Sequence, residues 1–276
     1  MSVGALQERW QDLQVLKSMW FPRIIGDSHK ERLESFYAPQ AHAYDHFRSR
    51  FLHGRDGMLR ACARKMLELE DYGELVWVDL GGGTAENVKF MSKYIDLSKF
   101  QKIYVVDICG PLCDVARGKA ADLGWTNVEI VEADVCEFAP DNRDATLVTF
   151  SYSLSMIPPF MAAVDKALSY LDQERGIFGI ADFYTSLKHD IPSRQHGFFS
   201  RWFWQAIFDL DSIDLGPARR QYLEHHLEQV FEENSCGGIP YVPLLKVPHY
   251  IWLGKKRIHR PGYAENGTAS TQGYRN

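Results

Sequence analysis

The chain has 276 residues, and 45% of them are apolar, so it can bury the core of one elaborated domain. Its formal net charge of −5 at pH 7 lacks the basic excess of a nucleic-acid binder, so DNA and RNA are not expected as partners. Five cysteines without a C-x-x-C pair are typical of reduced thiols. Since neither a membrane-spanning run nor a signal peptide is evident, the sequence predicts a soluble, cytoplasmic protein.

Residues 1–69 are expected to form a helical preface that covers the main domain. Apolar residues recur at helical spacing over residues 3–19, which predicts an amphipathic helix. Its polar face mixes acidic and basic residues, which favours packing on the domain or in a homodimer and leaves a peripheral membrane contact as the alternative. Ser28 and Glu31 have the spacing of a capping box, so a second helix is expected to begin there and to stop before Pro39.

The first strand of the main domain leads into a glycine turn. Apolar residues around Asp79 predict a strand, and Gly81, Gly82 and Gly83 follow it directly. Glycine permits positive φ and close backbone approach, and the following helix offers free N–H groups, so we expect a cofactor at this turn. The turn lacks the third glycine of the dinucleotide fingerprint and the Gly-Lys-Ser/Thr of a P-loop. Taken alone, it leaves NAD, FAD and S-adenosylmethionine open.

Three further strands also end in polar residues. The second strand ends at Asp107, 24 residues after Gly83, where folds of this kind hold the two hydroxyls of a ribose. The third strand runs into Asp134, and the fourth runs into Ser151 and Tyr152. Because parallel strands bring their carboxyl ends to one edge of a sheet, we expect these side chains to meet there.

The remaining elements complete a domain over residues 70–254. Three more strands are expected, at residues 176–182, 239–243 and 249–254. Residues 190–234 are unusually aromatic and are expected to form a helical insertion after the fifth strand. The polar residues 255–276 are expected to form a flexible tail. Alternation of strands and helices predicts an α/β fold with a mostly parallel sheet.

The turn at Asp79–Gly83, the strand-end acids and the Ser-Met-Ile-Pro run at 155–158 resemble class I S-adenosylmethionine-dependent methyltransferases. This resemblance implies a Rossmann-like, seven-stranded, mostly parallel twisted sheet with helices on both faces. It implies S-adenosyl-L-methionine as the cofactor, with Asp107 on the ribose, Asp134 and Val135 at the adenine, and the glycine turn along the methionine. The implied cofactor residues are Asp79, Gly81, Gly82, Gly83, Asp107, Ile108, Asp134, Val135 and Ser151.

The flanking motifs are similar to the N-methylating part of fungal and bacterial betaine-lipid synthases. The motifs are Phe36-Tyr37, Gln40-Ala41, Tyr44-Asp45, Phe47-Arg48, Gly54-Arg55, Met58-Leu59, residues 151–159, Asp182-Phe183-Tyr184 and residues 248–254. This similarity implies methyl transfer to the amino nitrogen of a homoserine-derived lipid headgroup, with Tyr37, Tyr44 and Arg55 closing the site. We expect the chain to act without that family's partner domain for aminocarboxypropyl transfer, which leaves an amino-acid-like or secondary-metabolite acceptor open.

Aromatic side chains and one acid are the candidates for the acceptor side. Tyr37, Tyr44 and Tyr152 could stabilise the cationic product, and Asp182 could orient the amine or accept its proton. Two alternatives stay open: transfer of the 3-amino-3-carboxypropyl group from the same donor, and a methyltransferase fold that does not methylate, such as a cyclase. No metal site is expected, because the histidine pairs of the chain lack a third ligand at useful spacing.

Overall fold

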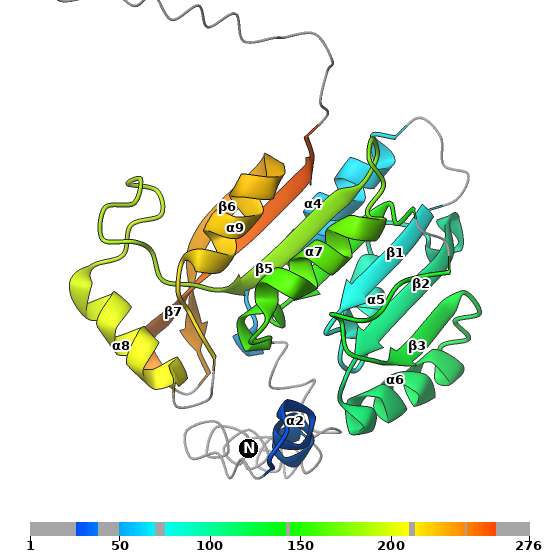
Figure 1. The fold of residues 1–276 in the computed structure, drawn as a ribbon, viewed down its shortest axis with the longest axis horizontal. Coiled ribbons are helices and arrows are strands. Elements are labelled where there is room, and N and C mark those ends of the chain that lie inside the picture. Colours follow the sequence, from blue (N-terminus) through cyan, green and yellow to red (C-terminus); the bar gives the residue numbers. More distant parts are fainter. Residues whose placement is uncertain are drawn as a thin grey trace, which may run out of the picture.

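A seven-stranded sheet forms the centre of the computed structural model (Figure 1), in the order β3-β2-β1-β4-β5-β7-β6. The structure describes residues 26–37, 50–69, 75–141, 144–209, 213–240 and 242–257. The strands are β1 (Leu75–Leu80), β2 (Phe100–Asp107), β3 (Val128–Glu132), β4 (Leu147–Ser151), β5 (Ile177–Phe183), β6 (Leu227–Ile239) and β7 (Val242–Lys256). β1 to β5 are parallel, and β7 is antiparallel to both of its neighbours. The expected seven-stranded, mostly parallel sheet is confirmed.

Helices cover both faces of this sheet. The α-helices are α2 (His29–Tyr37), α4 (Arg55–Leu67), α5 (Glu86–Met91), α6 (Gly110–Asp122), α7 (Phe160–Tyr170), α8 (Phe198–Asp209) and α9 (Ala218–His226), and the 3₁₀ turns are η2 (Leu97–Lys99) and η3 (Leu154–Met156). Buried residues of α4 and α5 pack with Trp77 on one face, and those of α7 and α9 pack with Val76 and Val78 on the other. All of β1 is therefore buried, since its alternating side chains meet a covered face on either side.

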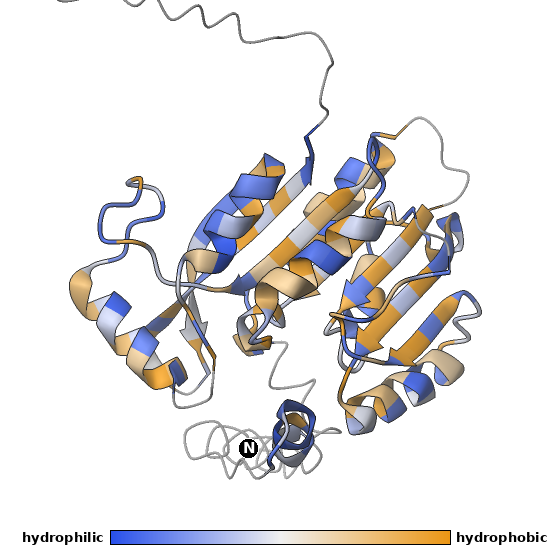
Figure 2. Cartoon of the chain, in the orientation of Figure 1, coloured by the Kyte–Doolittle hydropathy of each residue, from blue (hydrophilic) through white to orange (hydrophobic). Residues whose placement is uncertain are grey.

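The hydropathy of the chain follows this layering (Figure 2). The central strands are largely apolar, whereas α9 is largely polar. Within the described ranges, none of the helices is long and apolar enough to cross a bilayer.

The helix α2 begins where the capping box predicts it. The Ser28 Oγ accepts a hydrogen bond from the Glu31 N–H at 3.2 Å, and Glu31 Oε2 accepts one from the Ser28 N–H at 3.1 Å. Two backbone donors at the start of the helix are thereby satisfied. The predicted helix over residues 3–19 lies outside the described residues.

The prediction of a helical insertion over residues 190–234 is wrong for its last part. Only α8 and α9 are helical, and β6 begins at Leu227. β6 lies at the edge of the sheet, where charged side chains are common and an apolar alternation is not required. Its Glu232 forms ion pairs with Arg194 and Arg220, a long-range contact that no local pattern reveals.

β6 and β7 form a long hairpin in place of the short strands expected at residues 239–243 and 249–254. The pairing runs from Leu227 opposite Lys256 to Ile239 opposite Val242. The domain boundary expected after residue 254 therefore falls inside β7. The predicted tail beyond residue 257 lies outside the described residues.

Candidate cofactor and acceptor site

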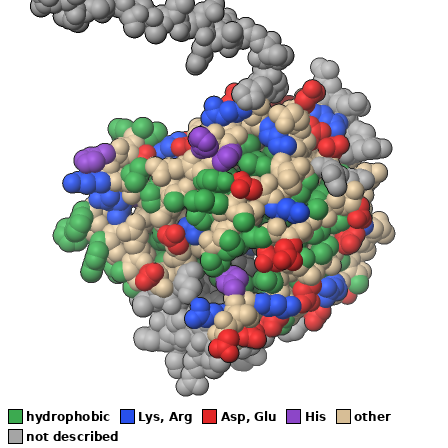
Figure 3. All heavy atoms as spheres, viewed as in Figure 1, with side chains coloured by type: hydrophobic (Ala, Val, Ile, Leu, Met, Phe, Trp, Pro, Cys, Tyr) green, Lys and Arg blue, Asp and Glu red, His purple; other side chains and the backbone are tan. Residues whose placement is uncertain are grey.

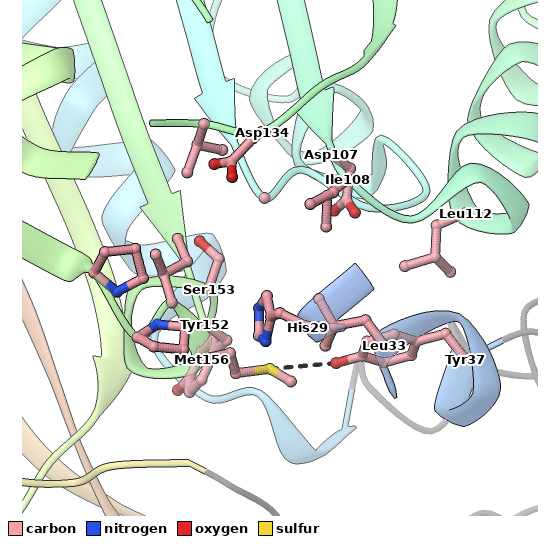
Figure 4. Close-up of a pocket in the computed structure, with 15 residues that line it drawn as sticks. His29, Leu33, Tyr37, Asp107, Ile108, Leu112, Asp134, Tyr152, Ser153 and Met156 are labelled. Carbon is pink, nitrogen blue, oxygen red and sulfur yellow. Dashed lines mark hydrogen bonds between the residues drawn. The ribbon is translucent and has the colours of Figure 1, made fainter. Parts of the chain in front are cut away.

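A pocket with an empty volume of about 670 Å³ lies between the carboxyl edge of the sheet and α2 (Figure 4). It opens where β1 has β2 on one side and β4 on the other, the point at which open α/β sheets bind their ligands. Its lining comes from the ends of four strands and from α2: His29, Leu33, Tyr37, Gly81, Asp107, Ile108, Leu112, Asp134, Val135, Tyr152, Ser153, Met156, Ile157, Pro158 and Pro159.

Two glycines of the turn after β1 are required for different reasons. Gly81 has φ +67°, and a Cβ at this position would lie 2.3 Å from the Cβ of Ser153. Gly82 has an ordinary φ, but its Cβ would lie 2.6 Å from Val105 Cγ1. A side chain at either position would therefore force the turn or its neighbours to shift.

The turn contributes close approach of the main chain rather than free N–H groups. The N–H groups of Gly81 and Gly82 donate to the carbonyl of Val106, and that of Gly83 donates to Asp107. β2 therefore already uses the donors of all three glycines, and the free N–H groups that the sequence predicts belong to α5, the helix that follows the turn.

Asp107 ties the glycine turn to the end of β2. Its Oδ2 accepts a hydrogen bond from the Gly83 N–H, and its Oδ1 accepts one from the Cys109 N–H, each at 2.9 Å. The carboxylate is held in one orientation at the pocket wall. Since each carboxylate oxygen can accept more than one hydrogen bond, the two oxygens can also receive a pair of vicinal hydroxyls.

We expect Asp107→Ala to weaken binding of S-adenosylhomocysteine by about 1–3 kcal/mol, because charge-assisted hydrogen bonds to the ribose are lost. Titration calorimetry measures this change. Asp114→Ala, which removes an exposed carboxylate from α6, is the matched control and should bind like the parent protein. An unchanged dissociation constant for Asp107→Ala would rule out the ribose assignment.

A polar and an apolar wall meet beyond Asp107. Asp134 follows β3, and its Oδ1 accepts a hydrogen bond from the Cys136 N–H at 2.8 Å. Ile108, Leu112 and Val135 supply apolar surface beside it. This arrangement fits a flat heterocycle that lies on apolar side chains and donates an amino group to a carboxylate at its edge.

α2 closes the pocket from the side opposite the sheet. His29, Leu33 and Tyr37 are spaced four residues apart and share the helix face that lines the pocket. Lys30 holds the helix to β3 through an ion pair with Glu132, with 2.6 Å between Nζ and Oε1. Sequence reasoning did not identify His29 as a pocket residue, and Figure 4 shows it projecting into the middle of the pocket.

Five of the nine predicted cofactor residues line the pocket: Gly81, Asp107, Ile108, Asp134 and Val135. The other four, Asp79, Gly82, Gly83 and Ser151, are not among its lining residues. Asp79 is fully buried below the glycine turn, where it accepts hydrogen bonds from Asn87 Nδ2 and Thr149 Oγ1. Burial raises the pKa of Asp79 to about 6. From this position Asp79 can support the glycine turn, and a direct contact between Asp79 and the cofactor stays a prediction.

The predicted acceptor residues have different surroundings. Tyr37 and Tyr152 both line the pocket, with Met156 between them in Figure 4, and the Tyr37 hydroxyl donates to Met156 Sδ at 3.3 Å. Tyr152 has φ +55°, a strained value for a bulky residue, and its hydroxyl donates to the carbonyl of His53. Tyr44 lies outside the described residues.

Asp182 is buried behind η3 and does not line the pocket. Its carboxylate accepts hydrogen bonds from the N–H and the hydroxyl of Ser155 and from the Phe183 N–H. Burial raises the pKa of Asp182 to about 6. These contacts make Asp182 a support for the loop after β4. Among the described residues, no group of three or more His, Cys, Asp or Glu side chains could hold a metal ion.

The sheet order, the glycine turn and the position of Asp107 agree with the S-adenosylmethionine-dependent methyltransferase that the sequence predicts. The pocket residues fit the cofactor, since the oriented carboxylate of Asp107 can receive the ribose hydroxyls and apolar side chains lie beside Asp134. Residues 78–174 match the family model of a methyltransferase domain, so the chain contains such a domain. The sequence matches no curated protein at a significant level.

Solved structures share the fold at low sequence identity. The N-methyltransferase NodS from Bradyrhizobium japonicum, in complex with S-adenosylhomocysteine, has a TM-score of 0.58 and 11% identity, over 83% of this chain and 99% of that one. A Galdieria sulphuraria protein assigned as a sarcosine dimethylglycine methyltransferase has a TM-score of 0.56 and 13% identity, over 73% of this chain and 84% of that one. The [4+2]-cyclase SpnF has a TM-score of 0.51 and 11% identity, over 74% of this chain and 82% of that one. These likenesses concern the fold.

Proposed function

We propose that the chain transfers a methyl group to the amino nitrogen of an amino-acid-like molecule or of a homoserine-derived lipid headgroup. The observation that supports this most is the pair of buried tyrosines, Tyr37 and Tyr152, which line the pocket from α2 and from the loop after β4. Aromatic side chains stabilise a cation that desolvation would otherwise disfavour, and methylation of an amine produces an ammonium group.

The residues that line the pocket would have separate roles in such a reaction. S-adenosylmethionine, when bound, would supply an electrophilic methyl group on a cationic sulfur that is a good leaving group for attack by an amine. Asp107 and Asp134 would hold the nucleoside, and Gly81 would let the methionine part approach the main chain. Tyr152 stays a neutral phenol, because burial raises its pKa well above the usual value. It can therefore orient the amine without taking its proton.

Similarity to other proteins also supports the proposed class of acceptor. NodS is named an N-methyltransferase, and the Galdieria protein is named for sarcosine and dimethylglycine, which are amino acids with a secondary or tertiary amine. The resemblance of the flanking motifs to betaine-lipid synthases agrees with an amino group on a homoserine unit. We infer from both an acceptor that carries an amine close to a carboxylate.

Incubation with methyl-labelled S-adenosylmethionine and a panel of amines tests the proposal. The panel includes homoserine, glycine, sarcosine and a synthetic diacylglyceryl homoserine. We expect an N-methylated product and one S-adenosylhomocysteine for each methyl group transferred, both detected by mass spectrometry. Release of methylthioadenosine would instead show aminocarboxypropyl transfer. Conversion of an added substrate with the cofactor unchanged would show chemistry of the kind that the SpnF name describes.

A further inference from the structure

Exposed apolar side chains are concentrated in one short segment of the described chain. Eight large apolar residues are exposed, and five of them fall within residues 187–202: Leu187, Ile191, Phe198, Phe199 and Trp202. The last three are 66%, 80% and 62% exposed. Single exposed apolar residues are ordinary, but such a cluster marks a surface that contacts another molecule or a membrane.

The helix α8 is apolar on two sides. Trp204 and Phe208 lie four residues apart and are buried against the domain. Phe198, Phe199 and Trp202 have i, i+3 and i+4 spacing and share the other side, which faces solvent. In Figure 1, α8 and the loop before it lie at the end of the molecule away from β1, β2 and β3.

Basic residues accompany these aromatic side chains. Residues 187–202 contain three basic residues and one acidic residue, a formal charge of +2 in a chain whose net charge is −5. Arg194 is bound to Glu232 and Glu224, whereas Lys188 is exposed and Arg201 lies on the helix beside the aromatic residues. Figure 3 shows apolar and basic side chains together at the edge of this face, over α8 and the preceding loop.

We propose that residues 187–202 bind the surface of an anionic lipid bilayer. Aromatic side chains on one helix face insert at the level of the headgroups, and flanking basic residues attract anionic lipids. A symmetric contact between two copies of the chain fits this surface less well, since it would bring together two surfaces that both carry a net positive charge.

The inner side of α8 connects this surface to the acceptor side of the pocket. The ring of Phe208 lies 4.9 Å from that of Phe183, which lies 4.5 Å from the ring of Tyr152. Tyr152 lines the pocket. If the proposed N-methylation is correct, the bilayer contact favours an acceptor that is anchored in lipid. The bilayer contact itself does not depend on the reaction.

Sedimentation with vesicles tests the lipid surface directly, using the full chain without cofactor or acceptor. We expect binding to phosphatidylcholine vesicles that contain phosphatidylglycerol, weaker binding to pure phosphatidylcholine, and a decrease with added salt. The triple variant Phe198→Ser, Phe199→Ser, Trp202→Ser should lose roughly tenfold or more in partition. The control Leu123→Ser, Met161→Ser removes exposed apolar residues elsewhere and should bind like the parent.

Three outcomes would overturn the proposal. The first is absence of the parent protein from the vesicle pellet at every salt concentration, and the second is a loss of binding by the control as large as that of the triple variant. Light scattering could also show that the triple substitution converts a dimer to a monomer, which would make this surface a contact between copies. Unchanged affinity of the triple variant for S-adenosylhomocysteine verifies its fold, and failure of methyl transfer leaves the vesicle result intact.

Discussion

Gly81→Ala is expected to weaken cofactor binding strongly while the rest of the domain stays folded. The residue has φ +67°, where a side chain costs about 1–2 kcal/mol. The new Cβ would also lie 2.3 Å from the Cβ of Ser153, which lines the pocket and donates to the Leu80 carbonyl. Ser153 or the turn must shift, so we expect affinity for S-adenosylhomocysteine to fall by roughly 100-fold, about 3 kcal/mol.

Gly118→Ala is the matched control for this substitution. Gly118 lies within α6, and a Cβ there meets no atom within 4 Å. Alanine in an open helical position is favoured over glycine by up to about 1 kcal/mol, so this variant should be as stable as the parent or more so, with unchanged affinity. Equal affinity of Gly81→Ala and the parent in calorimetry would show that the turn does not contact the cofactor.

The stability of the parent relative to Asp182→Asn is expected to fall as the pH rises from 4 to 7. Burial raises the pKa of Asp182 from 3.8 to about 6, so the folded state holds this proton more tightly than the unfolded state. The favourable contribution is therefore complete below about pH 4 and is lost as the pH rises through 6. The difference between the two proteins should change by about 3 kcal/mol over this range.

Urea denaturation of both proteins at several pH values measures this effect. The asparagine variant lacks the titrating group but keeps an oxygen acceptor for the donors of Ser155 and Phe183. Asp114→Asn on the surface of α6 is the control for loss of a carboxylate. A stability difference between parent and Asp182→Asn that is the same at pH 4 and pH 7 would contradict the buried position of this acid.

Strand ends were the part of the fold that sequence reasoning could predict. An apolar run that stops at an acid or a glycine is a local pattern, and the parallel sheet then brings Gly81, Asp107 and Asp134 to one edge. The capping box of α2 is equally local. These features need no knowledge of distant contacts, which is why the fold class and the cofactor pocket could be predicted together.

The features that sequence reasoning missed depend on distant partners. β6 is polar because it is an edge strand, and Glu232 is satisfied by Arg194 and Arg220 from segments far along the chain. His29 reaches the pocket only because α2 packs on α6 and pairs with β3. Asp182 stands at a strand end like Asp107, but the loop after β4 encloses it. The position of an acid at a strand end predicts that it lies near the site, but it does not predict whether its side chain lines the pocket or is buried in the protein.

The crystal structure of the protein soaked with S-adenosylhomocysteine tests the central claim most directly. We predict the ribose hydroxyls on the two oxygens of Asp107, the adenine beside Asp134 between Ile108 and α2, and the homocysteine part along Gly81. Electron density for the ligand at another place, or a pocket filled by protein side chains at saturating ligand, would contradict the account.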